Sequence, residues 1–234
     1  MDHARAVRQH DAYARLLREL GAEVERVPAD PEQPDAVFIE DTAVVLDELA
    51  VVTRPGAASR RGETAPVAAR LERERRLVRL EAPATLDGGD VIVAGRKVFV
   101  GQTTRTNAAG LAALNAALAP AGYDVIGVPV TGCLHLKSAA TAAAPGVILF
   151  NPHWVDAGSF QGYDTVAVHP EEPSAANVLR VGEVLVQDAA YPRTRKRLLE
   201  RGLTVRMVDL SELAKAEGAV TCCSLIVSRG SRYV

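Results

Sequence analysis

Two adjacent thiols near the end of the chain are the residues of this sequence best suited to covalent chemistry. Cys222 and Cys223 lie in the apolar run Gly218–Val227, which predicts a buried strand, and Cys133 is the only other cysteine. A thiol becomes a nucleophile when a neighbouring base or cation holds it as the thiolate. Because side chains alternate between the two faces of a strand, only one of these thiols can point into a site. The rest of the chain must therefore bring a histidine and carboxylates to this strand.

Polar residues recur along the chain at nearly equal intervals. The first strand of each predicted hairpin, and the thiol strand itself, carry one polar marker residue. The markers are separated by 49, 45, 42 and 45 residues, and they are Asp41, Asp90, His135, Asn177 and Cys222. The same order of elements lies between successive markers: a strand pair, a helix and a strand. A period of this length indicates a repeat architecture, and the helix in each repeat excludes an all-strand propeller blade. We therefore predict an α/β fold of five ββαβ units that form a closed ring, with the marker side chains converging on its axis.

Each marker has an ordinary explanation when it is taken alone. An aspartate near a turn is usually a cap, and a histidine on an apolar strand is more often a hydrogen-bonded core residue than a catalyst. Adjacent cysteines in an apolar strand are usually small core residues. Recurrence at equivalent positions of five repeats favours a shared functional site over five separate accidents.

The elements that must position the markers follow from hydrophobic periodicity. Helices are predicted at Asp2–Leu20, Thr64–Leu77 and Pro192–Arg201, and in a segment that ends near Leu118. Hairpins are predicted at Val37–Leu46 with Ala50–Thr53, Leu86–Val93 with Lys97–Gly101, Leu134–Ser138 with Val147–Phe150, and Ala175–Arg180 with Val184–Val186. Single strands are predicted at Glu23–Val27, Leu77–Leu80, Tyr123–Val130, Thr165–Val168 and Val205–Val208.

Composition and charge bound the class of protein. The chain has 234 residues, 48% of them hydrophobic, so it can bury the core of one domain that spans residues 1–234. The net charge of −2 and the aromatic content of 4% argue against nucleic-acid and membrane-surface partners. No apolar run reaches the roughly 18 residues of a spanning helix, and the N-terminus lacks a signal-peptide pattern. Three cysteines do not make a disulfide framework, so we expect a cytoplasmic protein; the oligomeric state, a homodimer included, stays open.

The markers define a chemistry if Cys222, His135 and the carboxylates of Asp41 and Asp87 meet. Two carboxylates would raise the pKa of a facing thiol unless a cation sits between them, which predicts a cationic substrate. A guanidinium is planar, and its donors match paired carboxylates. The thiolate would attack the central carbon of the guanidinium, and His135 would protonate the departing amine and then activate water. This scheme needs neither a metal nor a cofactor.

Two arginines suit the other end of such a ligand. Arg60 and Arg105 each follow a predicted hairpin and precede a helix, where the loops of a ring gather at one mouth. Arginines in that place can clamp a carboxylate, although a solvated surface charge explains them equally well. Together with a guanidinium pocket, they predict a small-molecule substrate such as arginine or one of its derivatives.

Six short motifs stand out when the chain is taken as a whole. They are Phe38–Asp41, Thr53–Ala57 with Ser59–Arg61, Leu86–Asp90, Arg105–Asn107, Leu134–Ser138 and Thr221–Ser224. In order and spacing they resemble the dimethylarginine dimethylaminohydrolase family over essentially the whole chain. That family belongs to the pentein superfamily of guanidine-modifying enzymes, so the resemblance implies a five-bladed ββαβ propeller. It also implies hydrolysis of Nω-methylated arginines, such as asymmetric dimethylarginine and monomethylarginine, to citrulline and a methylamine without a catalytic metal.

The resemblance implies a role for each matching residue. Cys222 matches the nucleophile, His135 the general acid and base, and Asp87 the acidic residue that assists at the guanidinium and the histidine. The other matches concern substrate binding: Glu40 and Asp41 in the guanidine pocket, Asp35 near the α-amino group, Arg60 and Arg105 at the carboxylate, and Ala216 through its backbone carbonyl toward the α-amino group.

The beginning of the chain departs from the family pattern. The resemblance implies a first strand and a substrate-covering loop before the helix Asp2–Leu20, and the chain starts at that helix. We therefore expect a pentein ring that lacks its N-terminal strand and lid, either in a shortened chain or through a start codon placed too far downstream. The strand that carries Cys222 would then have an unpaired edge.

Two other functions stay open at this point. Another pentein amidinohydrolase or an arginine deiminase would use the same thiol, imidazole and carboxylate chemistry on a different guanidine. A non-catalytic methylarginine-binding protein would have no reason to hold Cys222 as a reactive thiolate. Cys133 and Cys223 are assigned no role.

Overall fold

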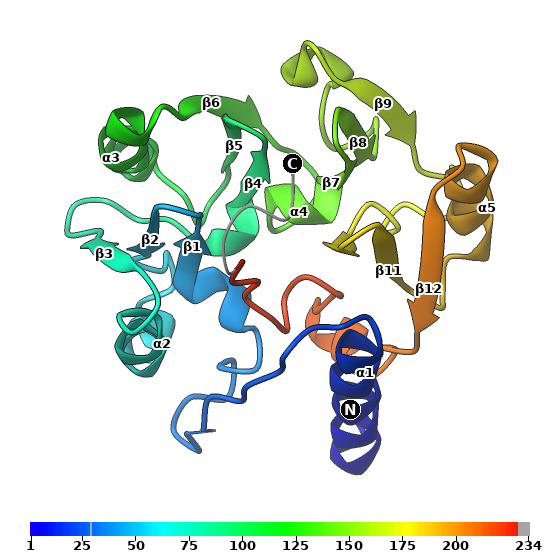
Figure 1. Ribbon diagram of the computed structural model, residues 1–234, viewed down its shortest axis with the longest axis horizontal. Coiled ribbons are helices and arrows are strands. Elements are labelled where there is room, and N and C mark those ends of the chain that lie inside the picture. The colour runs from blue at the N-terminus through cyan, green and yellow to red at the C-terminus, as the bar shows by residue number, and fades with distance from the viewer. Residues whose placement is uncertain (29, 229–234) are drawn as a thin grey trace. The chain divides into compact units, whose positions relative to one another are not determined.

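The strands of this protein form small sheets of one recurring design (Figure 1). The computed structural model describes residues 1–28 and 30–228, which contain four three-stranded sheets. In each sheet an antiparallel hairpin is followed by a third strand that pairs in parallel with the second. The sheets are, in chain order, β1 (Ala43–Val45), β2 (Leu49–Val52) and β3 (Arg76–Arg79); β4 (Val91–Ala94), β5 (Lys97–Gln102) and β6 (Asp124–Pro129); β7 (Ala140–Ala144), β8 (Val147–Phe150) and β9 (Asp164–Ala167); and β10 (Val178–Val181), β11 (Val184–Asp188) and β12 (Thr204–Val208).

A helix joins the second and third strands in three of these four sheets. The connecting helices are α2 (Thr64–Leu71), α3 (Ala108–Leu118) and α5 (Pro192–Glu200). The short 3-10 helix η5 (Ala157–Phe160) takes the same place in the sheet formed by β7, β8 and β9. The predicted ββαβ order is therefore confirmed for three units, and the remaining unit replaces its helix with a single tight turn.

Side-chain caps fix where the helices begin. Asp2 precedes α1 (His3–Glu19), and its carboxylate accepts the Arg5 N–H at 3.0 Å. Asn107 caps α3 in the same way. Glu172 is buried and accepts the first backbone N–H groups of α5. Each of these acceptors satisfies a donor that helix geometry leaves without a partner.

Two compact units divide the chain, and each is discontinuous in sequence. The first unit consists of Met1–Arg26 and Ser138–Cys223, and it contains α1 and the last two sheets. The second consists of Val27–Lys137 and the described residues after Cys223, and it contains the first two sheets. The single domain predicted over residues 1–234 stays a prediction.

Each unit has an apolar core of its own. In the second unit, Val98 and Leu114 belong to one buried cluster that joins the first two sheets to α3. In the first unit, Leu149, Leu185 and Leu198 belong to a cluster that joins the last two sheets to α5. Among the described residues, no helix has the length and apolar character needed to cross a bilayer.

The strand predicted at Gly218–Val227 is wrong. Val220–Cys223 form a turn, and no strand is assigned to residues 218–227. Part of the run is buried, and periodicity alone does not distinguish a partly buried apolar turn from a strand. The side chains of Tyr13 and Asn177 bind backbone groups of this segment, in place of the ladder that a strand would form.

Two further expectations need the same correction. Glu23–Val27 has no regular structure, and Leu134–Ser138 does not form a strand, because the short helix α4 (Leu136–Ala139) precedes β7. The helix predicted at Thr64–Leu77 ends at Leu71, since the charged residues that follow offer no apolar face to the core.

The polar markers precede their strands rather than interrupt them. Asp41 lies in the 3-10 helix η1 (Ile39–Thr42) and Asp90 in η3 (Gly88–Asp90), directly before β1 and β4. His135 precedes α4, and Asn177 lies directly before β10. Short polar side chains at such places can accept backbone N–H groups that regular pairing leaves free, which explains their equivalent positions.

Neighbouring leucines on α5 test the core of the first unit. Leu198 is fully buried, whereas Leu199 is 42% exposed. Leu198→Ala should lower the free energy of unfolding by about 2–5 kcal/mol, because it leaves a cavity in the core. Leu199→Ala, the matched control, should change it by about 0.5 kcal/mol or less. Urea unfolding measures both values, and equal losses would contradict the observed orientation of α5.

Candidate active site

A histidine and an aspartate form a buried pair in the second unit. Nε2 of His135 lies 3.0 Å from Oδ2 of Asp87 and 3.9 Å from Oδ1 of Asp41. Asp87 is fully buried, and His135 is 8% exposed. A buried carboxylate beside an imidazole orients the ring and stabilises its charged form. The pair can therefore hold and release a proton at a fixed position.

Backbone and hydroxyl groups from several loops fix Asp87. The Gly56 N–H donates to Oδ1 of Asp87 at 2.8 Å, and the Asp87 N–H donates to Oγ1 of Thr106 at 3.3 Å. The Thr106 hydroxyl in turn donates to Oδ2 of Asp90 at 2.6 Å. Asp90 also accepts the N–H of Leu136 at 2.9 Å. The buried carboxylate of Asp90 thus connects the segments that carry His135 and Asp87.

Asp41 is the second carboxylate beside the imidazole, and Gly89 and Arg60 hold it. The Gly89 N–H donates to Oδ1 of Asp41 at 2.9 Å, and Nη1 of Arg60 forms an ion pair with Oδ2. Nε and Nη2 of Arg60 also donate to the carboxylate of Glu63 at 2.7 to 3.1 Å. Nη2 donates in addition to two backbone carbonyls, one of them that of Asp35.

Every nitrogen of the Arg60 guanidinium therefore has an acceptor within the protein. Burial opposes the charge, but the hydrogen bonds and ion pairs with Glu63 and Asp41 outweigh it and raise the pKa of Arg60. Its predicted place between a hairpin and a helix is confirmed. The predicted role as a clamp for a ligand carboxylate stays a prediction, and the contacts described here are those of a residue that holds Asp41.

Glu40 lies buried next to Asp41 and forms an ion pair with Lys137. Nζ of Lys137 donates to Oε1 of Glu40 at 2.6 Å and to the Gly88 carbonyl at 3.2 Å. This ion pair connects the 3-10 helix η1 to the segment that follows His135.

Gly89 permits the close approach of the imidazole. A Cβ atom at this position would lie 2.8 Å from Nδ1 of His135 and 2.8 Å from Oδ1 of Asp41. Real Cβ atoms essentially never come within 3.0 Å of such neighbours. The glycine is therefore required by the distance between the chain and the ring.

The cluster shifts the pKa of its members. Burial opposes the imidazolium, yet the hydrogen bond that the ring donates to Asp87 and the charges of Asp41 and Asp90 outweigh burial and raise the pKa of His135. Burial raises the pKa of Asp90. Burial and the nearby Asp90 carboxylate also raise the pKa of the Cys133 thiol to about 12, so Cys133 is protonated near neutrality and unsuited to nucleophilic attack.

Two predicted binding residues lie at the edge of this cluster. Arg105 is half-buried between β5 and α3, as predicted, and its carbonyl lies so close to Gly56 that a Cβ there would be 2.5 Å away. The Arg105 guanidinium makes no hydrogen bond to the residues that the structure describes. Asp35 is exposed, and its backbone carbonyl accepts from Arg60.

The predicted nucleophile belongs to the first unit. Cys222 is half-buried in the turn Val220–Cys223, and its N–H donates to the Ala219 carbonyl at 3.2 Å. Cys223 is buried beside the same carbonyl, and Ala216 is exposed at the end of the 3-10 helix η6 (Leu213–Ala216). The structure thus brings together the predicted residues Glu40, Asp41, Arg60, Asp87 and His135 in the second unit, and describes Cys222 and Ala216 within the first.

The sequence interpretation missed three partners of these residues. Asp90 had been identified as a repeat marker without a role, although it contacts both segments of the histidine–aspartate pair. Glu63 stands three residues after Arg60, which is the spacing of a local ion pair. Lys137 lies in the same motif as His135, and only the folded chain pairs it with Glu40.

The three central side chains form a site for a positive charge. The nearest ligand atoms of Asp41, Asp87 and His135 all lie within 4.8 Å of one another, and all three residues are buried. Carboxylates at this spacing match the planar, multiple donors of a guanidinium.

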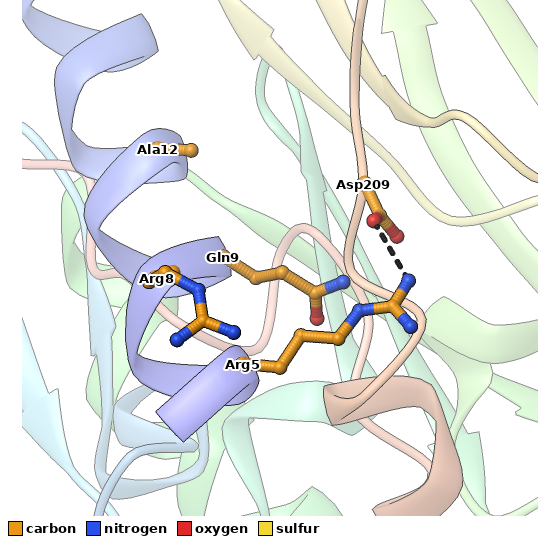
Figure 2. Close-up of a pocket in the computed structure, with 5 residues that line it drawn as sticks. All are labelled: Arg5, Arg8, Gln9, Ala12 and Asp209. Atoms are coloured by element: carbon orange, nitrogen blue, oxygen red, sulfur yellow. Dashed lines mark hydrogen bonds and ion pairs between the residues drawn. The ribbon is translucent and has the colours of Figure 1, made fainter. Parts of the chain in front are cut away.

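A separate hollow of about 330 Å³ lies on the first unit, against α1 (Figure 2). Arg5, Arg8, Gln9, Ala12 and Asp209 line it. Arg5 donates there to Asp209 at 3.3 Å and to the Ser211 hydroxyl at 3.0 Å. None of the residues predicted to act on a substrate lines this hollow.

Fold and site together define an α/β protein with repeated ββαβ units and a buried acid–base pair that suits a cation. The family model for eukaryotic N,N dimethylarginine dimethylhydrolase matches residues 1–138. The dimethylarginine dimethylaminohydrolase of Streptomyces coelicolor is 42% identical over 232 residues, which cover 96% of this chain and 87% of that protein. The enzyme of the same name from Pseudomonas aeruginosa is 36% identical over 226 residues, which cover 96% of this chain and 89% of that protein.

A solved structure agrees with these sequence relatives. It is a cysteine-to-serine variant of the Pseudomonas aeruginosa enzyme complexed with citrulline, and it matches with a TM-score of 0.91 at 35% identity. The match covers 95% of this chain and 88% of that chain. The chain belongs to the dimethylarginine dimethylaminohydrolase family.

Gly89→Ala tests the close packing of the cluster. The added methyl group must displace His135 or Asp41, and a shift of about 1 Å at a reacting group can cost about a hundredfold in rate. We expect kcat/KM for asymmetric dimethylarginine to fall by about that factor. Gly127→Ala is the control, because its Cβ would meet only flexible side chains, that of Leu111 at 3.1 Å and that of Gln102 at 3.5 Å. Equal activities of the two variants would show that the ring does not depend on Gly89.

The titration of His135 tests its electrostatic surroundings. The imidazole pKa should lie above the ordinary value of 6.5, because the hydrogen bond that the ring donates to Asp87 and the nearby carboxylates stabilise the charged ring. Asp87→Asn removes the largest of the raising contributions, so it should lower this pKa. NMR titration of the imidazole protons measures both values, and the His135→Gln spectrum assigns the signal among the five histidines. An unchanged pKa in Asp87→Asn would contradict the pair.

Proposed function

We propose that this protein hydrolyses Nω-methylated arginines, asymmetric dimethylarginine and monomethylarginine, to citrulline and a methylamine. The observation that carries the proposal is the buried cluster of His135, Asp87 and Asp41, in a chain that belongs to the dimethylarginine dimethylaminohydrolase family. Citrulline, which is bound in the solved relative, is the product that this reaction would release.

The charge balance of the cluster favours a cationic substrate. Five carboxyl groups lie within it, and three basic side chains face them: Glu40, Asp41, Glu63, Asp87 and Asp90 against Arg60, Lys137 and His135. Arg60 pairs with Asp41 and Glu63 and Lys137 pairs with Glu40, so the carboxyl groups of the cluster outnumber its basic side chains and a cationic ligand would offset the difference. A guanidinium held there would have its central carbon in a fixed orientation.

The first half of the reaction forms a bond to sulfur. In this proposal the Cys222 thiolate adds to the central guanidinium carbon, and the bond from that carbon to the methylated nitrogen breaks. His135 donates its proton to the departing nitrogen, so that dimethylamine or methylamine leaves as a neutral molecule. The raised pKa of His135 suits this step, because it keeps a larger fraction of the imidazole protonated at neutral pH.

The second half consumes water. Neutral His135 accepts a proton from water as the water oxygen adds to the same carbon, and the bond from carbon to the Cys222 sulfur then breaks. Citrulline leaves as the former water oxygen gives up its second proton to solvent, where the released amine takes it up, and the thiolate and the protonated imidazole are regenerated. Asp87 stabilises the imidazolium whenever it forms, since its carboxylate lies 3.0 Å from Nε2.

The substrate-binding roles complete the proposal. Asp41 and Glu40 would line the guanidine pocket, with Arg60 and Lys137 fixing their positions. Arg105, whose guanidinium has no described acceptor, would bind the ligand carboxylate, and Arg60 would contribute to the clamp only after leaving part of its present contacts. Asp35 and the Ala216 carbonyl would serve the α-amino group.

We further propose that the ββαβ units are blades of a five-bladed pentein propeller, with the segment around Cys222 belonging to the fifth. The recurring sheet design and the agreement with the solved relative support this arrangement. In such a ring Cys222 and His135 would face one another at the centre.

Product analysis with two adjacent cysteine variants tests the proposed activity. The wild-type chain should release citrulline and dimethylamine from asymmetric dimethylarginine in equal amounts. Cys222→Ser should lose at least about a thousandfold in kcat, because the nucleophile is removed. Cys223→Ser, the matched control, should retain most of the wild-type rate. Colorimetric citrulline and chromatographic amine assays provide the measurements.

Other outcomes would identify other functions. Ammonia release from arginine, with no turnover of methylated arginines, would indicate a deiminase. Binding of asymmetric dimethylarginine without any product, and with an unreactive Cys222, would indicate a binding protein.

A further inference from the structure

Three of the polar repeat markers make one kind of contact. Each accepts a backbone N–H from a residue next to the following marker. The Gly89 N–H donates to Asp41 at 2.9 Å, the Leu136 N–H donates to Asp90 at 2.9 Å, and the Thr221 N–H donates to Asn177 at 3.0 Å. Each of these bonds lies within one unit. A marker therefore holds in place the backbone on which the next marker stands.

We propose that Asn177 is a positioning residue for Cys222, acting through Thr221. The inference rests on the proposed function, in which Cys222 is the nucleophile, and it gives a role to a marker that the proposed mechanism leaves without one.

The amide of Asn177 binds the backbone N–H and the hydroxyl of Thr221, the residue before the thiol. Its Oδ1 accepts the Thr221 N–H at 3.0 Å, and its Nδ2 donates to the Thr221 hydroxyl oxygen at 2.9 Å. Both residues are 4% exposed, so water does not compete for these bonds. Two bonds from one planar group fix the direction of the backbone that leads into Cys222, because they restrain both its position and its rotation.

Hydrogen bonds from Thr141 also fix the backbone on both sides of Asn177. The Thr141 hydroxyl on β7 donates to the Ala176 carbonyl at 2.6 Å and accepts the Val178 N–H at 3.3 Å, so both neighbours of Asn177 are held. On the other side of the turn, the Tyr13 hydroxyl of α1 donates to the Val220 carbonyl at 2.7 Å. These side-chain bonds support a segment that has no strand ladder of its own.

Asn177→Ala separates positioning from binding. It should lower kcat by about tenfold or more, since misplacing a reacting atom by about 1 Å can cost a hundredfold. KM should change by less than about threefold, because the proposed substrate contacts are made by other residues. The rate of Cys222 alkylation by iodoacetamide should fall as well, and it is followed by fragment mass spectrometry that separates Cys222 from Cys223.

The chain offers a matched control for general destabilisation. Asn151 is also a buried asparagine of the first unit; its Nδ2 donates to the Pro173 carbonyl at 2.8 Å, and its Oδ1 accepts the His153 N–H at 2.9 Å. Asn151→Ala should therefore lower the thermal midpoint about as much as Asn177→Ala while kcat and Cys222 alkylation stay at wild-type values. If Asn177→Ala does not fold, Asn177→Asp keeps acceptors for the Thr221 N–H and hydroxyl, and it should remain folded with Cys222 alkylated more slowly at neutral pH because of the added charge.

The outcomes distinguish this inference from the proposed function. If the wild-type chain releases citrulline through Cys222 and Asn177→Ala has the wild-type kcat and alkylation rate, the positioning role is wrong. It is also wrong if Asn151→Ala loses as much kcat as Asn177→Ala. If the wild-type chain releases no citrulline, the proposed function fails. The alkylation rates still decide the role of Asn177, because slower alkylation in Asn177→Ala alone supports it and equal rates in both variants overturn it.

Discussion

The burial of carboxylates around one imidazole is the constraint on which the second unit depends. An ionised carboxylate loses several kcal/mol of solvation when it leaves water. Asp41, Asp87 and Asp90 can be buried only because backbone N–H groups, hydroxyls and charged partners from other loops meet them. The loops in turn take their positions from the carboxylates that they solvate. The site is therefore organised before a ligand arrives, which is what electrostatic catalysis requires.

This constraint explains why glycine and arginine occur where they do. Gly89 brings a backbone N–H to Asp41 and leaves room for His135, and a Cβ there would lie 2.8 Å from Oδ1 of Asp41 and from Nδ1 of His135. Arg60 neutralises part of the buried negative charge and joins η1 to the 3-10 helix η2 (Ala58–Glu63). The same buried charges thus supply both the chemistry and much of the specificity of the loop structure.

The sequence predicted the repeated order of elements well, because amphipathic periodicity and turn residues are local signals. The predicted helix at Asp2–Leu20 and the hairpin pairs correspond to α1 and to most of the observed strands. The apolar residues of Leu134–Ser138 and Gly218–Val227 predict strands that the structure does not contain. Their backbone groups are instead bound by side chains distant in sequence, such as Asp90 and Asn177, and no local pattern reports such contacts.

The sequence by itself determined the residue types of the site, their recurrence along the chain and the family to which they belong. Only the tertiary structure decided how those residues are used. It buried Arg60 against Asp41 and Glu63, paired Lys137 with Glu40, and gave Asp90 and Asn177 contacts 46 and 44 residues away. The physical reason is that hydrogen bonds and ion pairs depend on distance and direction in space. Separations of this size along the chain carry no information about either until the sheets and turns have formed.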